Sequence, residues 1–200
     1  MWKNTSELEA VELYQLLTGG VIPRPIAWVS TENRDGLTNL APYSFFSVAS
    51  CNPPILTITN VPSRDTLAKD TLANLMQTKE CVVNIVTHAE VQNMNASCAA
   101  MPRDKSEIDE IGIATVPSKS VKVVGVKNAP VRYECKLRES ITLSEKPIGG
   151  VLILLDVVAI YADQDKFNEN LLQADLIDAV GKLGGNDYCR AKTEITLARP

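Results

Sequence analysis

The sequence predicts a mainly β protein: an antiparallel β-barrel core with peripheral helices. Three observations support this fold class. At least six segments are rich in β-branched and aromatic residues or alternate apolar with polar residues. Helical patterns occur between them without the regular strand–helix alternation of a parallel sheet. An Asp35-Gly36 dipeptide, which is typical of tight hairpins, follows the first strand pattern.

A short helix is expected at the N-terminus, over residues 6–17. Ser6 and Glu9 have the spacing of a capping box, in which each side chain satisfies a backbone N–H group of the first turn. The pair Gly19-Gly20 follows the pattern and marks the end of the helix, because glycine is common just past a helix C-terminus.

The next segments read as strands. Residues 25–31 form the first, and a second leaves the hairpin and runs through residues 43–48. Pro42 places this second strand at a sheet edge or at a bulge, because proline cannot donate to a central ladder. Residues 52–54 predict a turn, and residues 55–59 predict a third strand.

The middle of the chain mixes helices with one strand. Asp70 has the character of an N-cap before residues with helical spacing. Thr87 and Glu90 match a second capping box. The expected elements are a helix after residue 70, a buried strand over 81–86, a helix over 88–100 and a surface helical turn over 105–110.

The C-terminal third is again β in pattern. Residues 131–137 alternate apolar and polar side chains, and residues 150–161 are too β-branched to favour a helix. Pro147 and Gly149 lie in the connection between these two segments, which can therefore pair antiparallel. A final strand is expected over residues 193–197.

Charge and hydropathy exclude several classes of protein. The chain has 200 residues and a net charge of −4, without the basic stripe that nucleic-acid binding requires. Its longest apolar run, residues 151–155, is far shorter than the ~20 residues of a membrane helix, and the N-terminal residues do not resemble a signal peptide. The five cysteines are scattered and odd in number, as is typical of free thiols. We therefore expect a soluble cytoplasmic protein.

Because the chain has a single histidine, His88, most catalytic sites built from metal-binding or acid–base side chains are excluded. A zinc site needs three or four ligands, chiefly His and Cys, and the cysteines contain no C-x-x-C pair. Any Ser-His or Cys-His nucleophile would depend on His88 alone. We expect no metal and no catalytic side chain, so an enzyme of this composition would rely on an organic cofactor. His88 itself is expected to be structural or to lie near that cofactor or a nicotinamide.

Two polar segments have the composition of a cofactor site. Hydroxyl and amide residues are dense at the strand ends between residues 24 and 51, where they could bind a heteroaromatic ring and a phosphate, although turns and edge strands use the same residue types. Arg64, Lys69 and Thr71 surround a helix start, which suits a phosphate, although a solvated helix start has the same composition.

The order of these motifs resembles the flavin reductase-like family with the FMN-binding split-barrel fold, in the branch of flavoredoxin and the reductase components of two-component monooxygenases. The motifs are Pro23-Arg24-Pro25, Val29-Ser30-Thr31, Asp35-Gly36, the run from Asn39 to Phe46, Pro53-Pro54, Lys69-Asp70-Thr71, Val83-Asn84, Glu134-Cys135, Gly184-Gly185, Tyr188 and Arg199-Pro200. They cover nearly the whole chain.

The resemblance implies one domain over residues 1–200, a six-stranded antiparallel split barrel, a homodimer, and FMN held noncovalently near the subunit interface. It places Ser30 and Thr31 near the ribityl phosphate, and Arg24 either at the cofactor or as a brace between the two prolines. The implied cofactor-binding residues are Arg24, Ser30, Thr31, Asn39, Ala41, Pro42, Tyr43, Ser44, Phe45, Phe46, Ser47, Ser50, Cys51, Arg64, Lys69 and Thr71. Ala41 to Ser47 would border the isoalloxazine, largely through backbone groups, and Arg64, Lys69 and Thr71 would face the phosphate.

The implied activity is an NAD(P)H:flavin oxidoreductase that passes electrons or reduced flavin to an acceptor protein. The alternatives are a flavoredoxin-like electron carrier without a nicotinamide site and a binding module that has lost redox function. The residues do not distinguish NADH from NADPH, or FMN from FAD, and they leave open which of the two cationic clusters, at Arg64 or at Lys69, meets the phosphate.

Overall fold

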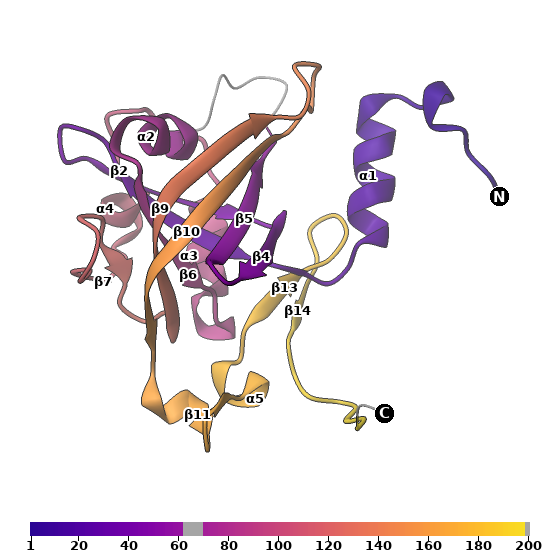
Figure 1. The fold of residues 1–200 in the computed structure, drawn as a ribbon. Coiled ribbons are helices and arrows are strands. Elements are labelled where there is room, and N and C mark those ends of the chain that lie inside the picture. Colours follow the sequence, from indigo (N-terminus) through magenta and orange to yellow (C-terminus); the bar gives the residue numbers. More distant parts are fainter. Residues whose placement is uncertain (62–69, 199–200) are drawn as a thin grey trace.

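The computed structural model describes residues 1–61 and 70–198. Its largest sheet has seven antiparallel strands in the order β3-β2-β6-β9-β10-β5-β4 (Figure 1). This sheet confirms the predicted mainly β, antiparallel architecture. Its strands are β2 (Ala27–Glu32), β3 (Thr38–Tyr43), β4 (Phe46–Cys51), β5 (Pro54–Asn60), β6 (Glu80–Ile85), β9 (Val131–Thr142) and β10 (Val151–Ala162).

Smaller elements surround this sheet. The short sheets are β1-β13-β14, β11-β12 and β7-β8, with β1 (Arg24–Pro25), β13 (Val180–Lys182), β14 (Tyr188–Arg190), β11 (Phe167–Asn168), β12 (Leu171–Leu172), β7 (Thr115–Val116) and β8 (Gly125–Val126). The helices are α1 (Ala10–Gly20), α2 (Asp70–Thr78), α3 (Val91–Ala96), α4 (Glu107–Ile111) and α5 (Ala174–Ile177), with 3₁₀ turns η1 (Thr5–Glu7), η2 (His88–Glu90) and η3 (Gln164–Lys166). Within the described residues, every helix is too short or too polar to span a bilayer.

Strand β2, inside the large sheet, is buried on both of its faces. Trp28 and Val29 are neighbours on β2, so their side chains point to opposite faces, yet neither exposes any surface. Val29 belongs to a cluster with Ile58 and Ile153, inside the barrel, whereas Trp28 packs with Met94 beneath α3. Burial of each large apolar side chain is worth about 1.5–3 kcal/mol, so these two clusters hold the sheet together.

The prediction of one continuous strand through residues 43–48 is wrong. Ser44 and Phe45 interrupt the strand and divide it into β3 and β4, which lie at the two ends of the large sheet. The backbone N–H of Thr59 donates to the Phe45 carbonyl oxygen at 2.8 Å, which holds this break beside β5. The break raises the sheet to seven strands from the six that the resemblance implied. Pro42 lies on edge strand β3, as its missing donor predicts.

Neither predicted capping box forms. Helix α1 begins at Ala10 after a separate turn, and it continues through Gly19-Gly20. At the second box, Thr87 makes no side-chain cap, and residues 88–100 form η2 and then the short α3. The Glu90 carboxylate instead accepts hydrogen bonds from the amides of Asn93 (2.8 Å) and Asn128 (2.7 Å). A partner distant in sequence therefore replaces the local cap.

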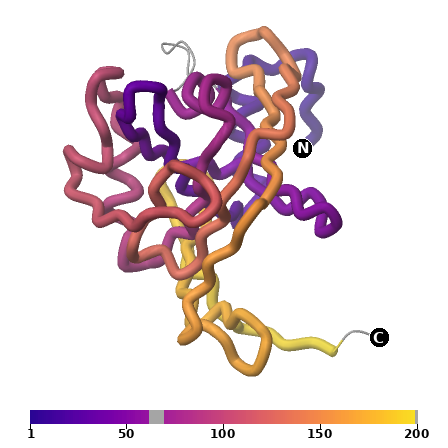
Figure 2. Tube along the Cα trace, turned by 60° about the vertical axis from the view of Figure 1, so that its left-hand side comes forward, coloured from indigo at the N-terminus to yellow at the C-terminus, as the bar shows by residue number. Residues whose placement is uncertain are grey.

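The helical turn expected on the surface over 105–110 is α4, and its first residues, Glu107 and Ile108, are buried. The strand expected over 193–197 is also wrong. Residues 191–198 are exposed and form no strand, and Figure 2 shows them leaving the body of the molecule. The last strand is β14, which pairs with β13.

Two aspartates anchor the start of this C-terminal segment. Asp178 accepts from Arg190 at 2.7 and 2.9 Å and pairs with Lys192 at 3.0 Å. Asp175 accepts from the backbone N–H of Thr193 at 3.0 Å. Lys192 and then Arg190 lower the pKa of Asp178 below its usual range, and the bonds from Thr193 lower the pKa of Asp175.

Acidification is expected to release this segment. A carboxyl whose folded-state pKa is depressed stabilises the folded state above its unfolded pKa of about 3.9, and that contribution disappears as the pH falls through the lower folded value. The protection factors of the amides at residues 188–194, which correct for the slower intrinsic exchange in acid, should therefore fall reversibly below about pH 4. Asp178→Asn should show fast exchange already at pH 7, and equal protection of the native segment at pH 3 and 7 would contradict the assignment.

Candidate functional site

A buried polar network joins the first hairpin to α2 and α4. The Glu107 carboxylate accepts from the Asn39 amide at 2.9 and 3.0 Å and from the Leu40 backbone N–H at 2.9 Å. The Asn39 side-chain oxygen accepts from Thr71 at 2.8 Å and from Thr31 at 3.4 Å. Three of the predicted cofactor residues, Thr31, Asn39 and Thr71, thus meet at the start of α2.

This network positions backbone more than it offers side chains to a ligand. Thr31 and Thr71 expose no surface, and Asn74 donates to the Thr31 hydroxyl at 3.1 Å. Tyr43 extends the network through a hydrogen bond with Thr71. Burial raises the pKa of its phenol strongly, and this hydrogen bond partly offsets that rise. Because these groups bind one another, their contribution to a site is to hold the beginning of α2 in place.

Ser30 and Ala41 also lie inside the fold. The Ser30 hydroxyl donates to the Val124 carbonyl oxygen at 2.6 Å. Asn84 joins the same region, since its amide donates to the Trp28 carbonyl at 2.8 Å and its oxygen accepts from the Val126 N–H at 2.8 Å. Ser30 therefore fastens the loop before β8 to the large sheet.

Arg24 is a buried cation whose hydrogen-bond partners among the described residues are neutral oxygens. Its guanidinium donates to the carbonyl oxygens of Thr18, Val21 (2.8 Å) and Leu183 (3.1 Å), and its Nε donates to Ser44 Oγ at 3.4 Å. The side chain is 6% exposed. Arg24 thus ties the end of α1, the β13–β14 hairpin and the segment before β4 together, elements that lie beyond the loop between the two prolines considered in the sequence.

Strand β4 is the most open part of the predicted site. Ser47 and Val48 are exposed, as is Cys51 at its end, while Phe45 and Phe46 are half-buried. Phe45 stacks against Tyr14 of α1 at 6.4 Å between ring centres, which explains why α1 stands beside this end of the sheet in Figure 1. Among the described strands β4 pairs with β5 alone, so the backbone groups of its other edge lie outside any ladder.

These features fit the polar edge of a flavin. An isoalloxazine ring needs backbone donors and acceptors along one side, and an unpaired strand edge supplies both. At the end of the adjacent β5, Asn60 is 1% exposed and its side-chain oxygen has no hydrogen-bond partner among the described residues. A buried acceptor without a partner is costly, so a donor from a bound ligand would satisfy it.

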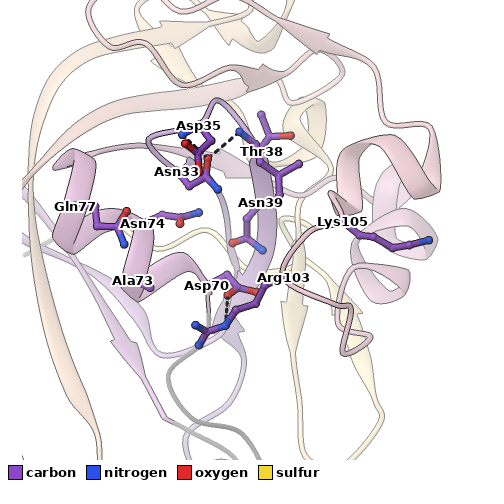
Figure 3. A pocket seen from close by; sticks show the side chains of 11 residues that line it. Asn33, Asp35, Thr38, Asn39, Asp70, Ala73, Asn74, Gln77, Arg103 and Lys105 are labelled. Atoms are coloured by element: carbon purple, nitrogen blue, oxygen red, sulfur yellow. Dashed lines mark hydrogen bonds and ion pairs between the residues drawn. The ribbon is translucent and has the colours of Figure 1, made fainter.

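A pocket of about 210 Å³ opens beside the start of α2 (Figure 3). Its walls include Asn33 and Thr38 of the first hairpin, Gln77 of α2, and Arg103, which pairs with Asp70 at 3.2 Å. The second cation of the lining, Lys105, pairs with Glu110 at 2.8 Å. Because both cations already have carboxylate partners, the pocket walls do not by themselves form a phosphate site. The predicted phosphate ligands Arg64 and Lys69 lie outside the described residues.

Most of the chain matches a known protein family. Residues 19–180 match the family model described as flavin reductase like domain. The chain belongs to the flavin reductase-like family. It is 36% identical over 198 residues to the uncharacterized protein YwrF of Bacillus subtilis (strain 168), with 97% of this chain and 96% of that protein covered.

Solved structures place this flavin reductase-like chain among split barrels. Nitrilotriacetate monooxygenase component B from Bacillus cereus superposes with a TM-score of 0.92 at 30% identity, covering 98% of both chains. The 2-nitrobenzoate 2-nitroreductase NbaA of Pseudomonas fluorescens superposes with a TM-score of 0.89 at 32% identity, covering 100% of this chain and 96% of that one. Flavoredoxin of Desulfovibrio vulgaris (Miyazaki F), at 16% identity and a TM-score of 0.76 over 100% of this chain and 97% of that one, shares the fold. The comparisons confirm the family and fold that the motifs predicted.

Sequence reasoning missed the residues that support the site from a distance. Glu107 was expected on the surface, and Asn74 and Arg103 were not singled out. Their partners lie elsewhere in the chain, since Asn39 and Glu107 are 68 positions apart. Polar residues within otherwise apolar segments, such as Asn84 in β6, are the one available signal, because a buried polar group must find a partner.

Proposed function

We propose that this chain is an FMN-dependent NAD(P)H:flavin oxidoreductase, formed as one domain over residues 1–200, that passes electrons or reduced flavin to an acceptor protein. The observation that carries this proposal is the family match together with the open edge of β4 beside Asn60. The likeness to a monooxygenase component B and to a nitroreductase, both at 30% identity or more, supports a reductive role.

The residues of the proposed site hold and orient the cofactor. Residues 44–51 would line the isoalloxazine through backbone groups, with Asn60 accepting one hydrogen bond from it, and Arg64 and Lys69 are the proposed phosphate ligands. FMN supplies hydride acceptance and electron release when it is bound, so the protein needs no general base of its own. Thr71 and Arg24 act indirectly, by holding α2 and the Ser44 segment in place.

We also propose a homodimer that covers the open edge. An exposed strand edge with apolar side chains is normally paired or covered. Val48 on β4 is 63% exposed, and Leu17 and Val21 near the end of α1 are exposed to a similar extent. A second copy packed over β4 and α1 would bury this surface and enclose the proposed flavin site.

The proposed function predicts the behaviour of the purified protein with FMN. We expect a yellow complex whose visible absorption bleaches when NADH or NADPH is added without oxygen. Arg64→Ala and Lys69→Ala should each weaken FMN binding about tenfold, the effect of losing one charge-assisted hydrogen bond. Arg34→Ala, an exposed change of equal charge in the first hairpin, is the matched control.

The outcomes separate the candidate functions. Bleaching by either nicotinamide supports the reductase, whereas reduction by dithionite alone favours an electron carrier without a nicotinamide site. A protein that stays colourless with added FMN contradicts both. Unchanged FMN affinity in both cation variants would remove the phosphate assignment and leave the ring site intact.

A further inference from the structure

A second, larger pocket lies between α3 and the β13–β14 hairpin; we name it the hairpin pocket. Its volume is about 600 Å³, within the range of small-molecule sites. Its distinctive lining residues are Gln92 and Asn95 of α3 and Lys182, Asn186, Tyr188 and Arg190 of the hairpin. The proposed FMN contacts use none of these residues.

The charge of the hairpin pocket favours an anion. The residues that line it include two cations, Lys182 and Arg190, and no carboxylate. Arg190 is neutralised from outside the pocket by Asp178, at 2.7 and 2.9 Å. Lys182 has no carboxylate within ion-pair distance among the described residues, and its ammonium donates to the carbonyl oxygens of Gly185 (2.7 Å) and Asp187 (3.2 Å).

The Lys182 charge is therefore only partly compensated, by the face of the Tyr188 ring and by the Asp187 carboxylate, which lies beyond ion-pair distance. Partial burial and then repulsion from Arg24 lower the pKa of its ammonium. The two carbonyl oxygens occupy two of the three ammonium donors. A carboxylate in the pocket could take the third and would offset the repulsion from Arg24, which a neutral ligand could not do.

The remaining lining suits a flat ring. The Lys182 ammonium lies over one face of the Tyr188 ring, 4.0 Å from its centre, and the Tyr188 hydroxyl donates to the Asn95 side-chain oxygen at 3.2 Å, so the rest of the ring borders the pocket. That bond fixes the ring orientation across the pocket. Val91 and Val180 add apolar surface. A cation, a fixed aromatic ring and aliphatic side chains together match a planar ring that carries one negative group.

The hairpin pocket is connected to the segment proposed to border the flavin. Strand β13 pairs with β1, which sets Lys182 opposite Arg24. Arg24 in turn bonds Leu183 of the hairpin and Ser44 before β4. The pairing of β13 with β1 and the hydrogen bonds of Arg24 therefore link the pocket to the Ser44 segment.

We propose that the hairpin pocket binds a small carboxylate carried on a planar ring, with Lys182 holding the carboxylate. This proposal concerns binding, and it stands whether or not the proposed reductase activity is correct.

The test is calorimetric titration of the full chain with benzoate, the simplest such ligand. We expect saturable binding that weakens about tenfold or more in Lys182→Gln. Benzamide, which has the same shape without the charge, should bind at least tenfold more weakly than benzoate. Lys127→Gln changes the net charge equally at an exposed site outside the pocket and should leave the benzoate affinity unchanged.

A second variant avoids any effect on the hairpin itself. Gln92 is exposed on α3, so Gln92→Glu leaves the packing intact but places a negative charge at the pocket. It should also weaken benzoate severalfold through like-charge repulsion. Melting temperatures of all variants separate loss of binding from loss of folding.

Each contrary result overturns the proposal. One such result is the absence of saturable benzoate binding at concentrations up to roughly 10 mM, ten times the 1 mM Kd of a weak complex. The other is equal benzoate affinity in Lys182→Gln and the native chain. Inorganic phosphate binding as tightly as benzoate would show a site without ring recognition. Stronger displacement of benzoate by NADPH than by NADH would assign the cations to a nucleotide phosphate instead.

Discussion

Replacing Glu107 with alanine is expected to lower the free energy of unfolding by about 3 kcal/mol. The substitution leaves the Asn39 amide and the Leu40 backbone N–H buried without their acceptor. Each buried unsatisfied donor costs about 1–3 kcal/mol, and relief of the carboxylate's own desolvation returns part of that cost. Urea denaturation of the native chain and the variant measures the difference.

The same substitution should also affect the cofactor site. Without Glu107, the Asn39 side chain can rotate, and its oxygen no longer holds Thr71 at the start of α2. We therefore expect weaker FMN binding along with the lost stability. Glu110→Ala is the matched control, because Glu110 lies on the same helix in an exposed ion pair with Lys105, whose loss should cost less than about 1 kcal/mol. An unfolding free energy within 1 kcal/mol of the native value for Glu107→Ala, roughly the size of one ordinary hydrogen bond, would refute the network.

Replacing Arg24 with methionine is the second large effect, with an expected loss of about 3 kcal/mol. Methionine fills much of the same volume but donates nothing to the carbonyl oxygens of Thr18, Val21 and Leu183. Charge-assisted bonds to carbonyls contribute about 1.5–3 kcal/mol each, while removal of a buried cation that has no carboxylate partner among the described residues recovers part of that sum. The net loss should appear in urea denaturation.

Arg24 joins three elements, so its loss should also be visible locally. We expect faster proteolysis near the end of α1 and in the β13–β14 hairpin, and weaker FMN binding through the Ser44 segment. Arg24→Lys keeps the charge but lacks the planar fork, and it should recover less than half of the lost stability. If Arg24→Met were cleaved at the native rate, the brace would have no mechanical role.

Local sequence determined most of the strands of this protein. The segments rich in β-branched and aromatic residues became β2, β5, β6 and β10, and the alternating segment became β9, because these side chains favour extended backbone that packs in a sheet. The hairpin at Asp35-Gly36 and the antiparallel pairing of β9 with β10 also follow from short-range turn chemistry. Pro42 correctly indicated an edge strand for the same reason: the missing donor acts locally.

Tertiary structure alone decided where polar side chains found partners. Glu90 and Glu107 have sequence patterns of a cap and of an exposed turn, yet Asn128 and Asn39 bind them from distant parts of the chain. The break at Ser44 and Phe45 likewise depends on the bond to Thr59 and on contact with Tyr14. A buried carboxylate or guanidinium must be satisfied wherever the fold brings a partner, and that partner is set by the closure of the barrel rather than by neighbouring residues. The motifs therefore sufficed for the family and most of the strands, whereas the roles of Arg24 and Glu107 and the existence of the hairpin pocket required the folded chain.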